Sequence, residues 1–211
     1  MSELLFTTEL LLQTMSQQQS AAIDAGSDEV LAERVRLSGD RAAFALLVTR
    51  YRGRVVALAR RMLAAQSADE AEDVAQETFL AAYEKRRSYG RGLPFRPWLY
   101  RIAVNRCLDR LRAESRRPAL LHWDSLPEPS LASADTDPLD ALLADEGERY
   151  LGTAVAALPP KLRAVFLLRH LDALSYDEIS AATGVPVSTV KTHLFRARAL
   201  LRTTLSEYLD R

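Results

Sequence analysis

The sequence predicts an all-α protein with two small helical domains joined by a flexible linker, the C-terminal one containing a helix-turn-helix. Three observations support this fold class. Apolar residues recur at helical spacing over most of the chain. A segment with four prolines and no regular period separates two such regions. Near the C-terminus a short helix, a turn and a longer helix follow one another. A chain of 211 residues is long enough to bury two small cores.

These signals divide the chain into four segments. Residues 1–27 are expected to form a flexible extension, residues 28–117 a first helical domain, residues 118–138 the linker and residues 139–211 a second helical domain. The start carries Glu3 and Glu9 and lacks both a basic leader and a long apolar run, so it predicts neither a signal peptide nor membrane insertion. A single cysteine excludes an internal disulfide, which fits a cytoplasmic protein.

The first domain is expected to contain four helices. Helical spacing covers residues 29–37, 40–63, 68–86 and 98–117, and Gly39 separates the first two. Residues 87–97 contain two glycines and two prolines, which predicts an irregular loop. Cys107 falls on the apolar side of the last helix, so we expect a buried, unreactive thiol. One apolar stripe on helix 40–63 is predicted to be buried: Phe44, Leu47, Val48, Tyr51, Val55, Leu58, Ala59 and Met62.

The charges are segregated along the chain, although they sum to zero. Residues 62–84 carry six acids and no base, and residues 118–148 carry eight acids and no base. Residues 84–117, in contrast, carry eleven Lys or Arg against three acids. Such blocks predict separate surfaces for different partners on one molecule.

The helix predicted over residues 68–86 has an apolar face and an acidic face. The acidic face includes Asp73, Gln76, Glu77 and Leu80. A leucine surrounded by acids is typical of a docking surface for a basic, partly apolar partner. A solvated face is the simpler interpretation. A metal or acid-base site is disfavoured because acids spaced along one exposed helix do not converge on a point.

The loop and the helix that follows it combine aromatic and basic residues. Tyr89 and Phe95 lie among arginines that include Arg91, and single-stranded nucleic acid needs both kinds of group, one to stack on a base and one to neutralise a phosphate. Anchoring of the loop to the core is the alternative, more so for Phe95 than for Tyr89. The next helix aligns three residues beside the loop that are able to contact phosphate or a base edge: Arg101, Asn105 and Arg112.

The C-terminal stretch 175–202 predicts a helix-turn-helix. Ser175 and Glu178 form a capping-box pattern, and Gly184 with Pro186 requires a turn before a second helix begins near Ser188. Val190 and three further apolar residues share the inner face of that helix. An aromatic and basic outer face suits a helix in the major groove of DNA, although a solvated basic helix is the simpler alternative. The outer face carries Ser188, Lys191, Thr192, Phe195 and Arg196.

Three stretches together resemble a known family: AEDVAQETFLAAYE, FRPWLYRIAVNRCLDRLR and LPPKLRAVFLLRHLDALSYDEISAATGVPVSTVKTHLFRARALLR. They are similar to the extracytoplasmic-function (ECF) group of alternative sigma factors of bacterial RNA polymerase, which keeps only the second and fourth domains of larger sigma factors. The resemblance implies a cytoplasmic stress-response protein that binds core RNA polymerase and directs promoter recognition and transcription initiation. It also implies an anti-sigma factor as a partner.

The resemblance assigns a role to each surface. The face of Asp73, Gln76, Glu77 and Leu80 would bind the polymerase. The loop from Tyr89 to Phe95, with Asn105 and its neighbouring arginines, would bind the single-stranded minus-ten element and hold a flipped base. Five residues of the last helix would contact the duplex minus-35 element: Ser188, Lys191, Thr192, Phe195 and Arg196. The loop sequence SYGRGLPFRP departs from the family, which leaves the preferred base undefined.

Two other function classes remain open at this level. A stand-alone helix-turn-helix regulator that binds duplex operator DNA would explain the C-terminal stretch, but it would need neither the acidic helix nor a second basic region. A nuclease or other hydrolase would need converging carboxylates or histidines, and His122, His170 and His193 are scattered along the chain. The sequence therefore predicts no enzyme, no metal site and no cofactor.

Overall fold

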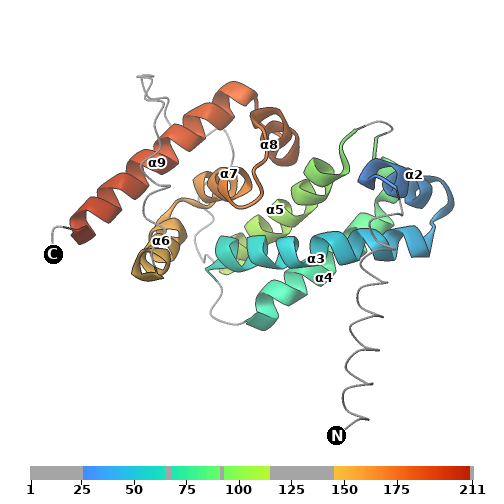
Figure 1. Ribbon diagram of the computed structural model, residues 1–211, viewed down its shortest axis with the longest axis horizontal. Helices are drawn as coiled ribbons and strands as arrows, with labels where there is room; N and C mark the ends of the chain where they lie inside the picture. The colour runs from blue at the N-terminus through green and yellow to red at the C-terminus, as the bar shows by residue number, and fades with distance from the viewer. Residues whose placement is uncertain (1–25, 65–67, 91–92, 115–144, 210–211) are drawn as a thin grey trace, which may run out of the picture. The chain divides into compact units, whose positions relative to one another are not determined.

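The computed structural model describes residues 26–64, 68–90, 93–114 and 145–209, and these contain eight α-helices, one short 3-10 helix and no strand (Figure 1). The predicted all-α fold class is therefore confirmed for these residues. The linker predicted over 118–138 and nearly all of the extension predicted over 1–27 lie outside the described residues, as does Arg91.

The chain divides into two compact units. The first unit contains Met1–Tyr51 and Tyr83–Phe95, of which the structure describes residues 26–51, 83–90 and 93–95. The second unit contains Arg52–Ala82 and Arg96–Arg211. The helix α3 (Arg41–Leu63) runs from the first unit into the second, since the division falls after Tyr51.

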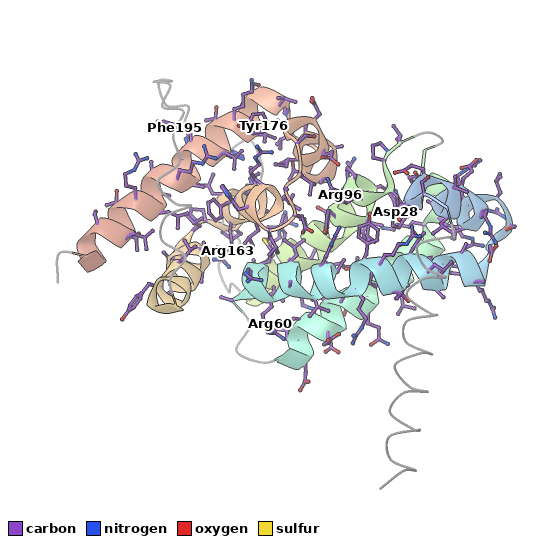
Figure 2. All side chains as sticks on the ribbon, in the orientation of Figure 1. Asp28, Arg60, Arg96, Arg163, Tyr176 and Phe195 are labelled. Carbon is purple, nitrogen blue, oxygen red and sulfur yellow. The ribbon has the colours of Figure 1, made fainter. Side chains whose placement is uncertain are left out.

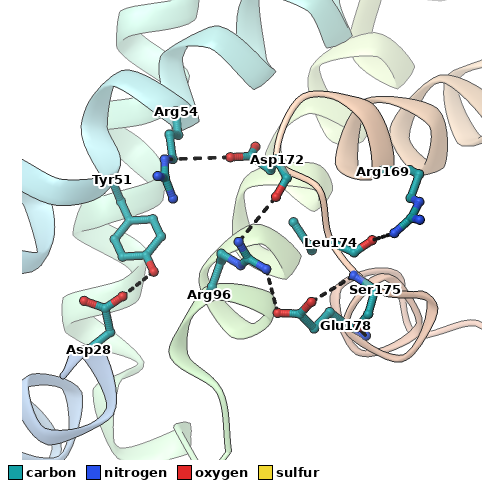
Figure 3. Close-up of polar contacts among 9 residues, drawn as sticks. All are labelled: Asp28, Tyr51, Arg54, Arg96, Arg169, Asp172, Leu174, Ser175 and Glu178. Atoms are coloured by element: carbon teal, nitrogen blue, oxygen red, sulfur yellow. Dashed lines mark hydrogen bonds and ion pairs between the residues drawn. The ribbon is translucent and has the colours of Figure 1, made fainter. Parts of the chain in front are cut away.

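The first unit is organised by helix α2 (Asp28–Ser38) and the start of α3. Ser27 caps α2 by accepting a hydrogen bond from the Val30 N–H, and Gly39 ends the helix in the left-handed region at φ 70°, as its place between two helical patterns predicted. Asp28 fixes α2 to α3 by accepting hydrogen bonds from the Tyr51 hydroxyl at 2.5 Å (Figure 3) and from Arg50 at 2.6 Å.

The second unit contains the rest of α3, most of α4 (Ala68–Glu84) and most of α5 (Phe95–Glu114). The predicted stripe of α3 is buried from Val55 to Met62, and on α5 Cys107 is fully buried as expected. Burial raises the pKa of the Cys107 thiol to about 12, so the thiol stays protonated and serves as a small apolar side chain.

The C-terminal part of the second unit is a four-helix bundle of α6 (Asp145–Ala157), α7 (Pro160–His170), α8 (Tyr176–Thr183) and α9 (Val187–Leu209). The first three of these helices each pack against α9. Every residue of α7 from Lys161 to Leu168 is buried, because neighbours surround this central helix. The break predicted at Pro159 and Pro160 is confirmed, with Pro160 at the start of α7 where its missing N–H costs nothing.

The segment predicted as an irregular loop over 87–97 is shorter than expected. A 3-10 helix, η1 (Arg86–Ser88), occupies its start, and α5 begins at Phe95 instead of Trp98. Pro97 therefore lies in the first turn of α5. A proline is tolerated there because the first N–H groups of a helix have no partner within the helix.

Candidate nucleic-acid and protein interfaces

The outer face of α9 is a surface of mixed basic, polar and aromatic character. The inner face is buried as the sequence predicts, with Val190, Leu194, Ala197 and Leu201 all at 3% exposure or less. Phe195 on the opposite side is 37% exposed, so the ring is open to solvent on the outer face (Figure 2). Its neighbours on this face are the exposed Ser188 and Lys191 and the half-buried Thr192 and Arg196.

The turn that presents α9 is fixed by side-chain and backbone hydrogen bonds. The Ser175 hydroxyl accepts from the Glu178 N–H at 3.2 Å, and the Glu178 carboxylate accepts from the Ser175 N–H at 2.8 Å (Figure 3). The predicted capping box is therefore confirmed. Gly184 closes α8 in the left-handed region at φ 77°, and the Ser180 hydroxyl donates to the Val185 carbonyl at 2.6 Å. These bonds hold α9 in one direction relative to α8.

His193 belongs to the inner side of α9 and adds no positive charge to the outer face near neutral pH. Its side chain is 2% exposed, and burial is the main cause that lowers its pKa from 6.5 to about 4. The positive charges of Arg196 and Lys161 lower the pKa further. The charge of the outer face therefore comes from lysine and arginine alone.

One group near this face was missed by the sequence analysis. Tyr176, the first residue of α8, lies with its ring centroid 5.3 Å from Cζ of Arg169 and 5.8 Å from Nζ of Lys191. The three residues come from α7, α8 and α9. No spacing rule links positions in three different helices, so only the folded structure reveals the contact.

The acidic face of α4 contains Asp73, Gln76, Glu77 and Leu80, and Leu80 is 58% exposed. The predicted arrangement of an exposed leucine among polar side chains is thus present. Glu77 differs from its neighbours because its carboxylate accepts a hydrogen bond from Arg110 of α5 at 2.5 Å. This bond raises the pKa of Arg110. The pair neutralises one of the two carboxylates among the four predicted residues, and the other, Asp73, is exposed.

The basic row on α5 is placed as the sequence predicts. Arg101, Asn105 and Arg112 are all exposed, at positions four and seven residues apart along the helix. Arg112 forms an ion pair with Asp109 at 2.8 Å one turn earlier. Asn105 presents both an amide donor and a carbonyl acceptor, which is what contact with a base edge needs.

The expectation that Tyr89 and Phe95 expose their rings for base stacking is wrong for this structure. The two side chains are 4% and 2% exposed, and their ring centroids lie 6.0 Å apart, with Phe95 also 5.6 Å from Tyr51. The Tyr89 hydroxyl donates to the Leu93 carbonyl, and burial raises the tyrosine pKa to about 12. The aromatics thus anchor the loop to the core, the alternative that the composition had left open.

Leu93 of this loop is a large apolar side chain that is 56% exposed. It lies so close to Gly90 that a Cβ at that position would come 2.6 Å from its Cδ1. The approaching atom is the end of an exposed leucine side chain, which can rotate away, so this contact alone does not require glycine at position 90.

The described part of the chain holds no group of three or more His, Cys, Asp or Glu side chains placed to bind a metal ion. Within the same residues, no helix is long and apolar enough to cross a membrane.

Comparison with known families gives two matches in this chain. The Sigma-70 region 2 family matches residues 47–117, and the Sigma-70 region 4 family matches residues 148–201. The first match covers the acidic face of α4 and the basic row of α5, and the second covers the helix-turn-helix. The matched segments lie in the order that the resemblance predicted.

Relatives of known name extend over most of the chain. ECF RNA polymerase sigma-E factors of Salmonella typhimurium and Escherichia coli are 38% identical over 177 residues, which is 82% of this chain and 91% of theirs. The sigma-E factor of Haemophilus influenzae is 38% identical over 183 residues, covering 83% and 93% of the two chains.

Two solved structures share the fold. CnrH, in complex with the cytosolic domain of CnrY, is 29% identical with a TM-score of 0.62, and the match covers 85% of this chain and 97% of that one. The sigma factor RpoE of Bartonella quintana, in complex with the anti-sigma factor NepR, has a TM-score of 0.56, with coverages of 77% and 96%. At 21% identity the second likeness concerns the fold alone.

Proposed function

This chain belongs to the ECF group of the sigma-70 family, and we propose which of its surfaces contacts the polymerase and which contact promoter DNA. As a member of that family it binds core RNA polymerase and directs promoter recognition and transcription initiation. One observation carries this conclusion: a single chain contains both region 2 and region 4 and is 38% identical to sigma-E factors over 82% of its length.

The α4 surface of Asp73, Gln76, Glu77 and Leu80 is the proposed polymerase contact. An exposed leucine supplies the apolar anchor that the centre of a protein interface needs, and the polar residues around it supply the rim. The exposed carboxylate of Asp73 favours a basic partner surface. Glu77 contributes through its pair with Arg110, which fixes the direction of its side chain.

The outer face of α9 is the proposed contact for the duplex minus-35 element. Ser188, Lys191 and Thr192 lie near the start of the helix, where residues of a recognition helix meet base edges. Phe195 can contact a thymine methyl group, and Arg196 can bond a guanine edge or a phosphate. The face combines apolar, polar and cationic groups over two turns, which suits the mixed chemistry of the major groove.

The loop and α5 are the proposed contact for the single-stranded minus-ten element. Arg101, Asn105 and Arg112 supply cations and an amide on the exposed side of α5, and Arg91 supplies a further cation from the loop sequence. We assign Tyr89 and Phe95 a supporting role, because both rings are buried and fix the loop that presents Leu93.

A protein inhibitor is a further proposed partner. CnrH, which shares the fold, was solved in complex with the cytosolic domain of CnrY. We extend this to an anti-sigma factor that binds the present chain. Sigma factors regulate transcription without catalysing a reaction themselves, so the chain is proposed to have no enzymatic activity. Its place of action is the cytoplasm, where the bacterial polymerase and its template are found.

A stand-alone helix-turn-helix regulator is not favoured. Such a protein would need only the segment that matches region 4, yet the match to region 2 spans residues 47–117.

Transcription in vitro tests the proposal. Purified full-length protein is mixed with core RNA polymerase and a library of genomic promoter fragments, and the transcripts are sequenced. We expect specific start sites that are absent with core polymerase alone, and only weak binding of duplex DNA by the protein without polymerase. A lack of specific initiation, or tight binding of one duplex site without polymerase, would contradict the proposal.

A further inference from the structure

The ring of Tyr176 contacts two cationic side chains at once. Nζ of Lys191 lies 5.8 Å from the ring centroid, and Cζ of Arg169 lies 5.3 Å from it. Cations at these distances are attracted by the negative face of an aromatic ring. Tyr176 is itself half-buried at the start of α8 (Figure 2), so the ring lies between protein interior and solvent.

The local structure restricts the motion of this ring. Tyr176 directly follows the N-cap Ser175, whose hydroxyl and N–H both bond with Glu178. Arg169 is held as well, because its guanidinium donates to the Leu174 carbonyl at 2.8 Å (Figure 3). Hydrogen bonds therefore fix the backbone next to Tyr176 and the side chain of Arg169, one of the two cations beside the ring.

Lys191 differs from these residues because it is exposed and its long stem is flexible. A lysine ammonium on four methylenes has many rotamers, and fixing one of them on DNA binding costs entropy. A lysine that already rests on an aromatic ring has fewer rotamers to lose. It also points in one direction before the DNA arrives, which favours contact with one base over its neighbours.

We propose that Tyr176 is a positioning residue that orients Lys191 for its contact with the minus-35 element. The inference rests on the proposed contact between the outer face of α9 and duplex DNA, and it assigns a specificity role to a residue outside that helix. Removing the ring should therefore weaken the base preference that depends on Lys191. An intact ring without a hydroxyl should preserve this preference.

The test measures base preference by transcription in vitro with core polymerase, on promoters whose minus-35 element is randomised. Tyr176→Leu is expected to lower output about two- to fivefold, the size of an exposed cation–π contact, and to relax preference at the position where Lys191→Ala relaxes it. The double variant should be no worse than Lys191→Ala alone. Tyr176→Phe should match the wild type.

A second variant separates cation attraction from packing. Tyr176→pentafluorophenylalanine keeps the shape of the ring but removes its negative face, so it should fold and show the loss of output and of base preference expected for Tyr176→Leu. It therefore provides the test if the leucine variant fails to fold. Thermal unfolding of each variant checks the fold.

Three results would overturn the inference: multiplied losses in the double variant, wild-type preference with the fluorinated ring, or an unaltered preference after Lys191→Ala. Failure of the wild type to show any upstream preference would instead contradict the proposed function.

Discussion

At the scale of single residues, His193 makes stability depend on pH. Its folded-state pKa is about 4 and the unfolded value is near 6.5, so between these values the unfolded chain binds the extra proton. Stability therefore decreases as the pH falls from 6.5 toward 4, by up to about 1.4 kcal/mol for each pH unit. Denaturant unfolding at several pH values measures this slope.

Two variants show whether the slope belongs to His193. His193→Gln should flatten the pH dependence in this window. His170→Gln is the matched control, because His170 is exposed at the end of α7, and it should keep the wild-type slope. An unchanged slope in His193→Gln would mean that another group takes up the proton.

Substitution of Arg196 shows whether its guanidinium contacts a base or a phosphate. Arg196→Ala should lower promoter use by about 1–3 kcal/mol and relax the preference at one upstream position if the guanidinium contacts a base. Arg202→Ala, at an exposed position six residues later on the same helix, is the control and should leave the preference unchanged. Sequencing of transcripts from a randomised upstream element gives both results. A uniform loss across all bases would assign Arg196 to a phosphate.

The two aromatic residues of the loop show where single-residue prediction fails. The exposure of Phe195 follows from its position on a helical wheel, because the apolar residues that define the buried face of the helix are close to it in the sequence. Burial of Phe95 involves Tyr51, which is distant in sequence, and Tyr89 in turn packs against Phe95. Composition showed aromatics among arginines, and composition alone does not tell which side of a loop faces the core.

At the scale of elements, Gly184 should be required for the turn of the helix-turn-helix. Gly184→Ala places a Cβ in the left-handed region at φ 77°, which should lower the free energy of unfolding by about 1–2 kcal/mol. The nearest side-chain atom to that Cβ would be 3.6 Å away, so the cost comes from the backbone. Gly152→Ala in α6 is the control.

The control should change stability in the opposite direction. Gly152 lies within a helix, and a Cβ there meets nothing within 4 Å, so alanine should stabilise the protein by roughly 0.5–1 kcal/mol. Urea unfolding of both variants measures the difference. Equal effects of the two substitutions would show that the left-handed conformation does not limit position 184.

Helix ends were predictable where they have a local chemical cause. The capping box at Ser175 and the glycines at 39 and 184 mark the observed boundaries, because each acts within one turn. The start of α5 was missed by three residues, since Pro97 is compatible with either a loop or a first helical turn. Proline limits a helix only from its second turn onward.

At the scale of the whole molecule, the charge blocks predicted separate surfaces, and the structure modifies that picture. The acids of α4 and the bases of α5 belong to different blocks in the sequence, yet Glu77 and Arg110 form a pair. Part of each block is therefore neutralised within the fold. The charge that remains on each surface depends on which helices pack together. A count of charges along the sequence does not contain this information.

Polymerase binding should depend on Leu80. Leu80→Arg puts a cation among polar and acidic residues at a side chain that is 58% exposed, so it should abolish co-elution with core polymerase and leave the unfolding midpoint unchanged. Leu37→Arg is the matched control. Leu37 is 69% exposed on α2, outside the proposed contact, and its variant should bind polymerase as the wild type does. Loss of binding in both variants would indicate a general effect of the added charge, and binding by Leu80→Arg would remove α4 from the interface.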